Sequence, residues 1–376
     1  MSQVVLKNAN VLLPDLTFAC TDVVLEDGRI AFVGKTDAPG TDLSGKYLIP
    51  GLVDIHTHGA GGGDHLDGTP AATAAILRRM AQVGTTTVLS TIMTQSKENM
   101  LKAAENTKLC AARELGARIR GIYLEGPFFS EQYKGAQHPM YLIDPEHDLI
   151  DQLQAASGNL LKIVSLAPEK TGALDFIRSR TDVRIFAGHT AADYDTAAAA
   201  FDAGARGLTH TFNGMTPLHH RKPGVIAAAM EREQVFCECI CDGFHVHKAM
   251  VGLLYRQVGA ERFCMISDSL RPAGLPDGEY LSGGQPVTVK DGKAHLADGT
   301  IAGSTACLLE EVKNLVSWGI CDLAHAVYAA SAVPARAAGI DDQVGTIEAG
   351  KAADLLILSE NLDLQAVYIG GKPWVE

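Results

Sequence analysis

Between residues 48 and 338, short apolar runs alternate with segments whose apolar residues recur at helical spacing. Continuous apolar runs are typical of strands buried on both faces of a parallel sheet. Eight runs are expected as strands: "LIPGLVDIH", "TTTVLST", "IRGIYLEG", "LKIVSLAP", "VRIFAGHT", "RGLTHTF", "QVFCECICDG" and "RFCMISDS". Helical patterns separate them, such as the segment from Thr69, the expected N-cap, to Gly84, the expected stop. The alternation predicts an α/β fold with a (β/α)8 TIM-like barrel. A doubly wound open sheet is the alternative, but no GxGxxG turn supports it.

Both ends of the chain show a different pattern, in which short β-type runs alternate with turns. The first segment contains "QVVLKNANVLL" and "TDVVLEDGRIAFVG", where Asp27-Gly28 indicates a hairpin. The last segment, "GTIEAGKAADLLILSENLDLQAVYIGGKPWVE", is similar in character. We therefore expect residues 1–47 and 339–376 to form one small β-sandwich domain beside a catalytic barrel of residues 48–338. Residues 281–299 are expected as an inserted hairpin that folds over the site.

Composition narrows the class of protein. The chain has 376 residues, of which 47% are hydrophobic, so it can bury a large core. Its formal net charge of −12 argues against nucleic acid or an anionic membrane as a partner. Eight cysteines form no CxxC pair, no run reaches the length of a membrane span, and the start lacks a signal peptide pattern. We expect a cytoplasmic protein.

Residues that bind metals or transfer protons stand where the predicted strands end. They are His56 and His58 after the first strand, Glu125 after the third, His189 after the fifth, His210 after the sixth and Asp268 after the eighth. Strands of such a barrel end at one face, so these side chains should converge there. Imidazole nitrogen and carboxylate oxygen are ligands of Zn²⁺ and, less selectively, of Fe²⁺, Mn²⁺ and Co²⁺. Each residue alone is equally consistent with a hydrogen-bonded strand end, but six together favour a catalytic metal site.

The residues also carry a family resemblance. "PGLVDIHTHG", "GKAADLLIL" and the strand-end set resemble the amidohydrolase superfamily. Within it, "LEGPFF", "KGAQHP", "GHT", "THTFNGM", "PGV", "DGFHV", "SDS" and "GTIAGS" are similar to the N-acetylglucosamine-6-phosphate deacetylase family, in order and over essentially the whole chain. The resemblance implies hydrolysis of N-acetylglucosamine 6-phosphate to glucosamine 6-phosphate and acetate. The alternatives are an amidohydrolase acting on N-acetylgalactosamine 6-phosphate, a cyclic amide or an N-acyl amino acid, and a non-catalytic barrel that senses a sugar phosphate.

The resemblance implies a role for each site residue. Glu125, His189 and His210 would hold one firmly bound divalent metal, most simply zinc. Some family members replace the His-x-His pair and hold one metal, whereas others keep it and can hold two. His56 and His58 are therefore candidates for a second, weaker or variable site bridged by Glu125. Asp268 would take the proton from water and return it to the leaving nitrogen. His138 would help to hold the carbonyl oxygen as negative charge develops.

Further residues are expected to bind the substrate. Asn213, Gly214 and Arg221 would hold the phosphate, and in the family the arginine reaches the neighbouring subunit's site, which implies a homodimer. The other substrate contacts implied by the resemblance are Gln137, Asp242, His245, Ile301, Ala302 and Gly303. Three cysteines on one strand face, Cys237, Cys239 and Cys241, are expected as packing residues rather than metal ligands.

Overall fold

The computed structural model describes residues 3–375, so the outermost residues of the two predicted terminal segments (1, 2 and 376) lie outside the described residues. At its centre are eight parallel strands in sequence order, as predicted: β6 (Leu52–Thr57), β9 (Thr85–Met93), β10 (Arg118–Glu125), β11 (Leu161–Leu166), β12 (Arg184–Ala187), β13 (Gly207–Leu208), β14 (Phe236–Cys239) and β15 (Phe263–Met265). The first and last strands approach each other beyond β15, where Asp268 N donates to His56 O at 2.9 Å and Thr57 bridges Ser269. The prediction of a TIM-like barrel is therefore confirmed.

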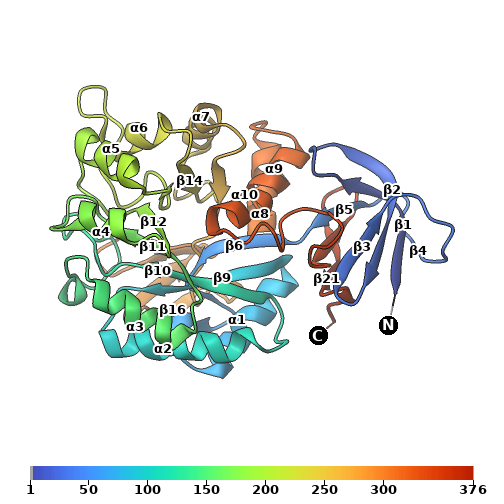
Figure 1. Cartoon of the computed structure of the whole chain (residues 1–376), viewed down its shortest axis with the longest axis horizontal. Coiled ribbons are helices and arrows are strands. Elements are labelled where there is room, and N and C mark those ends of the chain that lie inside the picture. Colours follow the sequence, from blue (N-terminus) through green and yellow to red (C-terminus); the bar gives the residue numbers. More distant parts are fainter. Residues whose placement is uncertain (1–2, 376) are drawn as a thin grey trace.

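Helices surround the strands (Figure 1). They are α1 (Pro70–Gln82), α2 (Lys97–Ala111), α3 (His147–Ser157), α4 (Ala173–Ser179), α5 (Tyr194–Ala203), α6 (Gly224–Met230), α7 (Lys248–Val258), α8 (Leu308–Ser317), α9 (Leu323–Ala329) and α10 (Ala332–Ala338). Short 3-10 turns lie at His65–Asp67 and Pro139–Tyr141. Thr69 caps α1 as predicted, because its side chain accepts a hydrogen bond from Ala72 N at 3.3 Å. Within residues 3–375, a search for helices with the length and hydropathy of a membrane span finds none.

The strands are buried on both faces, which explains their continuous apolar sequence. All nine residues of β9 are buried. Around β14 the two faces differ: Cys237, Cys239 and Cys241 pack in the large cluster that includes helix residues, whereas Ile240 packs with the barrel interior. The cysteines are therefore packing residues. Their alternation also directs Glu238 toward the inside of the barrel.

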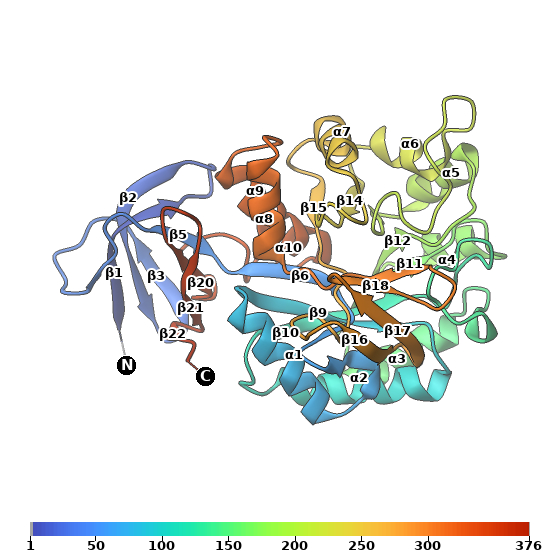
Figure 2. The ribbon, with the colours of Figure 1, turned by 180° about the vertical axis from the view of Figure 1, so that it is seen from behind.

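Both chain ends contribute to one small sheet, which lies at one end of the molecule (Figure 2). Its strands are β1 (Val4–Leu12), β2 (Phe18–Glu26), β3 (Arg29–Val33), β4 (Thr41–Asp42), β5 (Tyr47–Pro50), β20 (Leu355–Leu358), β21 (Leu364–Ile369) and β22 (Lys372–Pro373). The predicted Asp27-Gly28 turn joins β2 to β3. Strand β5 pairs with both β1 and β20, so it ties the two ends of the chain together. The domain limits at 47/48 and 338/339 stay a prediction.

The insertion after the last barrel strand is larger than the predicted hairpin. It is a four-stranded antiparallel sheet of β16 (Gly278–Ser282), β17 (Gln285–Lys290), β18 (Lys293–His295) and β19 (Ile301–Gly303). A separate two-stranded ladder of β7 (Gly59–Ala60) and β8 (Gly63–Asp64) contacts it through Asp64. Ser282 Oγ and Gly283 N donate to Asp64 Oδ2 at 3.1 and 3.0 Å, and Gln285 Nε2 donates to Ala136 O. The insertion is thereby fixed to the loops at the carboxyl ends of the barrel strands.

Candidate active site

Glu125, at the end of β10, lies between four imidazoles that come from three other strand ends. Its Oε1 lies 3.1 Å from Nε2 of both His189 and His210, and 3.5 Å from Nε2 of His56. Its Oε2 lies 3.3 Å from Nε2 of His58. All five side chains are buried. They form two groups that share Glu125, one with His56 and His58 and one with His189 and His210, and each group is close enough to hold one ion.

The hydrogen bonds of His189 and His210 fix where their protons lie. His189 Nδ1 is 2.8 Å from Tyr133 O, and His210 Nδ1 is 3.1 Å from Asn213 O. A carbonyl oxygen only accepts, so Nδ1 carries the proton of each neutral ring and Nε2 presents a lone pair. The two Nε2 atoms are 3.1 Å apart. Ligands of a tetrahedral zinc ion with bonds of 2.0–2.1 Å are roughly 3.3 Å apart, so this spacing fits a cation between them.

The second group depends on an acidic residue that the sequence analysis missed. Glu238 Oε2 lies 3.1 Å from His56 Nδ1 and accepts from His210 N at 3.0 Å. The carboxylate thus orients His56 with Nε2 toward Glu125 and Asp268, and no hydrogen-bond partner of this Nε2 is found among the described residues. A carboxylate on the far nitrogen is the usual support of a metal-binding imidazole. The signal in the sequence was a charged residue between two cysteines of a buried strand.

The electrostatic environment favours positive charge among the imidazoles. Burial acts to lower the pKa of His58, but hydrogen bonds to Asp268 and Glu125 raise it to about 9. Burial acts to raise the pKa of Glu125, but the four surrounding imidazoles hold it well below its usual value. Asp268 lies 3.2 Å from His58 Nε2, and its pKa is also lowered although burial opposes this. A divalent cation would supply the same positive charge while the imidazoles stay neutral.

Three of the predicted site residues have unusual backbone conformations. His189, His210 and Asp268 have φ values of 44°, 26° and 49°, in the left-handed region that non-glycine residues rarely adopt. Such conformations cost about 1–3 kcal/mol each and cluster at functional sites. At each of these strand ends the chain turns sharply and directs its side chain toward the centre of the barrel mouth.

A cavity of about 240 Å³ opens over this centre. The predicted residues that line it are His58, Glu125, His189, His210, Asn213, Gly214, His245, Asp268, Ile301, Ala302 and Gly303. Met93, Gly135, Ala136 and Thr300 line it as well and were not predicted. A Cβ on Gly214 would lie 2.8 Å from His189 Nδ1, so glycine is needed for this close approach of loop and imidazole.

Two predicted substrate residues lie behind the cavity rather than on its wall. Gln137 Nε2 donates to Glu125 Oε2 at 2.6 Å, and its Oε1 accepts from Thr94 N at 3.0 Å. Asp242 Oδ2 lies 2.7 Å from His245 Nδ1, and Asp242 Oδ1 accepts from His245 N at 2.9 Å. Gln137 therefore positions Glu125, and Asp242 holds His245 with Nε2 unpartnered among the described residues.

Known proteins are similar to this chain over nearly its full length. The model of the Amidohydrolase family matches residues 262–374. An N-acetylgalactosamine-6-phosphate deacetylase of Escherichia coli O157:H7 is 37% identical over 93% of this chain and 93% of its own length. An N-acetylglucosamine-6-phosphate deacetylase of Vibrio furnissii is also 37% identical, over 92% and 88% of the two chains. The chain belongs to the N-acetylglucosamine-6-phosphate deacetylase family of amidohydrolases.

A solved structure of this deacetylase family supports the fold. A mutant N-acetyl-D-glucosamine-6-phosphate deacetylase of Mycobacterium smegmatis, in complex with N-acetyl-D-glucosamine-6-phosphate, superposes with a TM-score of 0.93. It is 32% identical, and the match covers 99% of each chain. The barrel, the small sheet and the inserted sheet therefore all belong to the aligned region.

Two residues to which the deacetylase family pattern assigns roles lie outside the cavity. His138 caps the 3-10 turn Pro139–Tyr141, where its Nδ1 accepts from Met140 N at 3.2 Å. Arg221 is exposed on the loop between β13 and α6, beside a different cavity that Tyr133 and Asp193 also line. Within one chain neither residue lines the cavity over Glu125, His189 and His210, so their predicted roles stay predictions.

We expect Glu238→Gln to weaken metal binding by His56 and His58, because the amide cannot serve as an anionic acceptor for His56 Nδ1. A lost outer contact of this kind typically costs about 10–100-fold in metal affinity. Titration against a chelator of known affinity, followed by elemental analysis, measures the change. Glu233→Gln, an exposed carboxylate earlier in the same segment, is the matched control. Equal metal retention by both variants would refute the orienting role of Glu238.

Proposed function

We propose that this chain hydrolyses N-acetylglucosamine 6-phosphate to glucosamine 6-phosphate and acetate. The observation that carries the proposal is the convergence of Glu125, His189 and His210 on one point beside Asp268, at the base of a cavity that also holds Asn213 and Gly214. The first three residues provide a metal site. Asp268 provides a proton acceptor within reach of that site, and the loop provides hydrogen-bond donors for an anionic substrate.

We assign Glu125, His189 and His210 to one firmly bound divalent ion, with zinc as the first candidate and Fe²⁺, Mn²⁺ or Co²⁺ as alternatives. His56 and His58 would hold a second, weaker ion that shares Glu125. When bound, a divalent ion supplies Lewis acidity, which polarises an amide carbonyl and lowers the pKa of water. Gln137 keeps the shared carboxylate oriented through its 2.6 Å hydrogen bond.

Asp268 would move the proton. Water adds its oxygen to the acetyl carbon, Asp268 accepts the proton that the water releases, and the carbon–nitrogen bond breaks as that proton passes to the nitrogen. The transfer is needed because an amide nitrogen leaves poorly as an anion. His138 is assigned to the carbonyl oxygen: its Nδ1 accepts a backbone hydrogen bond, which leaves the proton on Nε2 as the donor. This assignment requires the loop that carries His138 to move toward the cavity.

The sugar phosphate would occupy the cavity between two loops. Asn213 and Gly214 would donate to the phosphate, and His245, whose Nε2 is directed by Asp242, would contact the sugar. Residues 301–303 of the inserted sheet also line this cavity. We further propose a homodimer in which Arg221 of each subunit completes the phosphate site of the other.

N-acetylgalactosamine 6-phosphate is the second candidate substrate. The Escherichia coli relative at 37% identity carries that name, and the two sugars differ only in the stereochemistry of one hydroxyl.

We also propose a cytoplasmic location, because all eight cysteines are free, and five of them (Cys110, Cys237, Cys239, Cys241 and Cys264) are buried.

The 6-phosphate provides the first test. We expect kcat/KM for N-acetylglucosamine to be about 100-fold or more below that for its 6-phosphate, because charge-assisted hydrogen bonds to the phosphate would be lost. Acetate release measures both rates, and N-acetylgalactosamine 6-phosphate is assayed beside them. Equal rates with and without the phosphate would contradict a sugar-phosphate deacetylase. A preference for the galactosamine compound would select the second candidate.

A mixed dimer tests Asp268 and Arg221 together. Asp268→Asn and Arg221→Ala subunits, co-expressed with different tags, should each lose most activity as homodimers, by about 100- to 10,000-fold for the proton-transfer variant. The mixed dimer has one complete site and should regain about half of the wild-type activity. Lys222→Ala, on the same loop as Arg221, is the control and should stay active. A mixed dimer no more active than its parents would contradict the shared site.

A further inference from the structure

A second cavity, of about 600 Å³, lies at the opposite end of the barrel from the candidate active site. Its wall combines the start of β10 (Arg118–Arg120) with the β2–β3 turn and the β21–β22 turn of the small sheet. Strand β10 also carries Glu125, seven residues after Arg118, so the two sites are separated by about 23 Å along one strand. We call this cavity the lower site.

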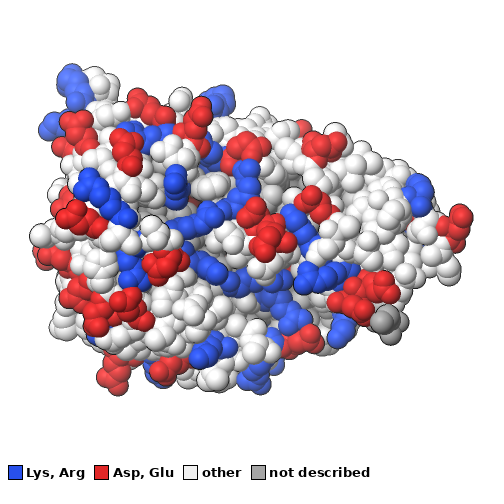
Figure 3. All heavy atoms as spheres, viewed as in Figure 1, with Lys and Arg blue, Asp and Glu red and all other residues white. Residues whose placement is uncertain are grey.

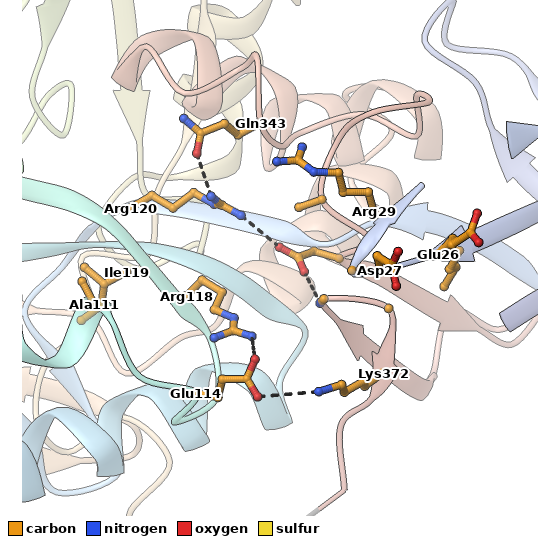
Figure 4. Close-up of a pocket in the computed structure, with 16 residues that line it drawn as sticks. Glu26, Asp27, Arg29, Ala111, Glu114, Arg118, Ile119, Arg120, Gln343 and Lys372 are labelled. Carbon is orange, nitrogen blue, oxygen red and sulfur yellow. Dashed lines mark hydrogen bonds and ion pairs between the residues drawn. The ribbon is translucent and has the colours of Figure 1, made fainter. Parts of the chain in front are cut away.

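Cationic side chains from several segments face the lower site (Figure 4). They are Arg29, Arg118, Arg120 and Lys372. Two carboxylates lie among them: Glu114 bonds Arg118 at 2.7 Å and lies 3.9 Å from Lys372, and Asp354 lies 3.7 Å from Arg120. Figure 4 places the remaining acidic residues, Glu26 and Asp27, on the hairpin away from Arg118 and Arg120. The lining as a whole therefore contains four cationic and four acidic side chains. Away from the hairpin, the three cations Arg118, Arg120 and Lys372 are accompanied by only two carboxylates, those of Glu114 and Asp354.

This excess is local, because the whole chain has a net charge of −12. Figure 3 shows a band of Lys and Arg side chains across the middle of one face of the molecule, toward the small sheet. Burial lowers the pKa of Arg120, Asp354 opposes this, and the like charges of Arg118 and Arg29 lower it further. The three guanidinium groups thus repel one another, and a bound anion would offset this repulsion.

Two buried polar atoms in the lower site lack hydrogen-bond partners among residues 3–375. One is the Nε donor of Arg120, whose Nη1 donates to Gln343 Oε1 at 2.8 Å. The other is Oδ2 of Asp354, a residue only 6% exposed, whose Oδ1 accepts from Gly370 N at 2.7 Å. The 3.7 Å separation of Asp354 Oδ2 from Arg120 Nη2 is too long for a hydrogen bond. An unsatisfied donor beside an unsatisfied acceptor calls for a ligand that offers both complements.

We propose that the lower site binds a small sugar phosphate. Its phosphate oxygens would accept from Arg118, Arg120 and Lys372, and one of its hydroxyls would donate to Asp354 Oδ2. A cavity of about 600 Å³ is of the size that holds such metabolites. Because the wall combines barrel and small-sheet residues, a bound sugar phosphate would link the two parts of the molecule. This binding is additional to the phosphate subsite of the proposed reaction and does not depend on that reaction.

Calorimetric titration with glucose 6-phosphate, which has no acetyl group to lose, tests the proposal. We expect wild-type protein to bind two molecules per chain. Arg118→Gln/Lys372→Gln should bind one molecule with unchanged affinity and the other at least tenfold more weakly, because two phosphate contacts are lost. Arg178→Gln/Lys97→Gln removes two exposed, ion-paired cations elsewhere and is the matched control. It should bind as the wild type does.

Two further measurements keep the result decisive. Thermal unfolding without ligand checks that the double variant is folded; if it is not, Arg29→Gln replaces it, with the same loss expected. Titration with inorganic phosphate tests the hydroxyl contact. At the lower site, identified as the binding event that the double variant weakens, glucose 6-phosphate should bind at least tenfold more tightly than phosphate. Two unchanged events in the folded variant, or a single wild-type event that the folded variant keeps unchanged, would overturn the proposal. A single wild-type event that the variant loses would support the lower site and count against the phosphate subsite of the proposed reaction instead. Equal affinity for both anions would overturn the contact with Asp354.

Discussion

The site depends on a close approach of three atoms with lone pairs. Glu125 Oε1 and the Nε2 atoms of His189 and His210 are mutually 3.1 Å apart, and the carbonyl partners of both Nδ1 atoms keep the protons away from this point. Without positive charge, the three lone pairs repel one another in a buried environment. A shared cation would convert this repulsion into attraction, and the strained backbones of both histidines would then be the cost of directing them there.

An outer ring of contacts keeps this arrangement rigid. Glu238 supports His56 and the backbone of His210, Gln137 supports Glu125, and Asp242 supports His245. Each supporting group comes from the barrel interior or from a loop at the strand ends, so the parallel sheet sets their spacing. The inserted sheet completes the wall through residues 301–303, and its link from Ser282 to Asp64 holds it over the same face.

The sequence was sufficient to predict the barrel and the convergence of the candidate metal ligands. All eight strands had continuous apolar runs. A residue that follows a barrel strand lies at the barrel mouth, so His189 and Asp268 could be placed at the same face without knowledge of their contacts. Glu238 was missed because its function comes from the inward register of β14, which the cysteines around it concealed. Gln137 was assigned to substrate from the family resemblance alone. Its hydrogen bonds to Glu125 and Thr94 join segments apart in sequence, so no local pattern indicated them.

The four strands of the insertion and the lower site could not be predicted for a related reason. Strand β19 pairs with β18 across an irregular turn, and Arg29, Arg118, Arg120 and Lys372 come together only when the two chain ends fold against the barrel. Local patterns report burial and turns, whereas these features arise from pairings between distant segments. The roles proposed for His138 and Arg221 would require loop movement and a second subunit, neither of which a single folded chain contains.

Anomalous diffraction from crystals of active protein, recorded at the absorption edges of zinc, iron, manganese and cobalt, tests the central claim most directly. The account predicts a peak at one of these edges about 2.0–2.2 Å from Glu125 Oε1 and from Nε2 of His189 and His210. Crystals that deacetylate the substrate and show no peak between these three atoms would contradict it.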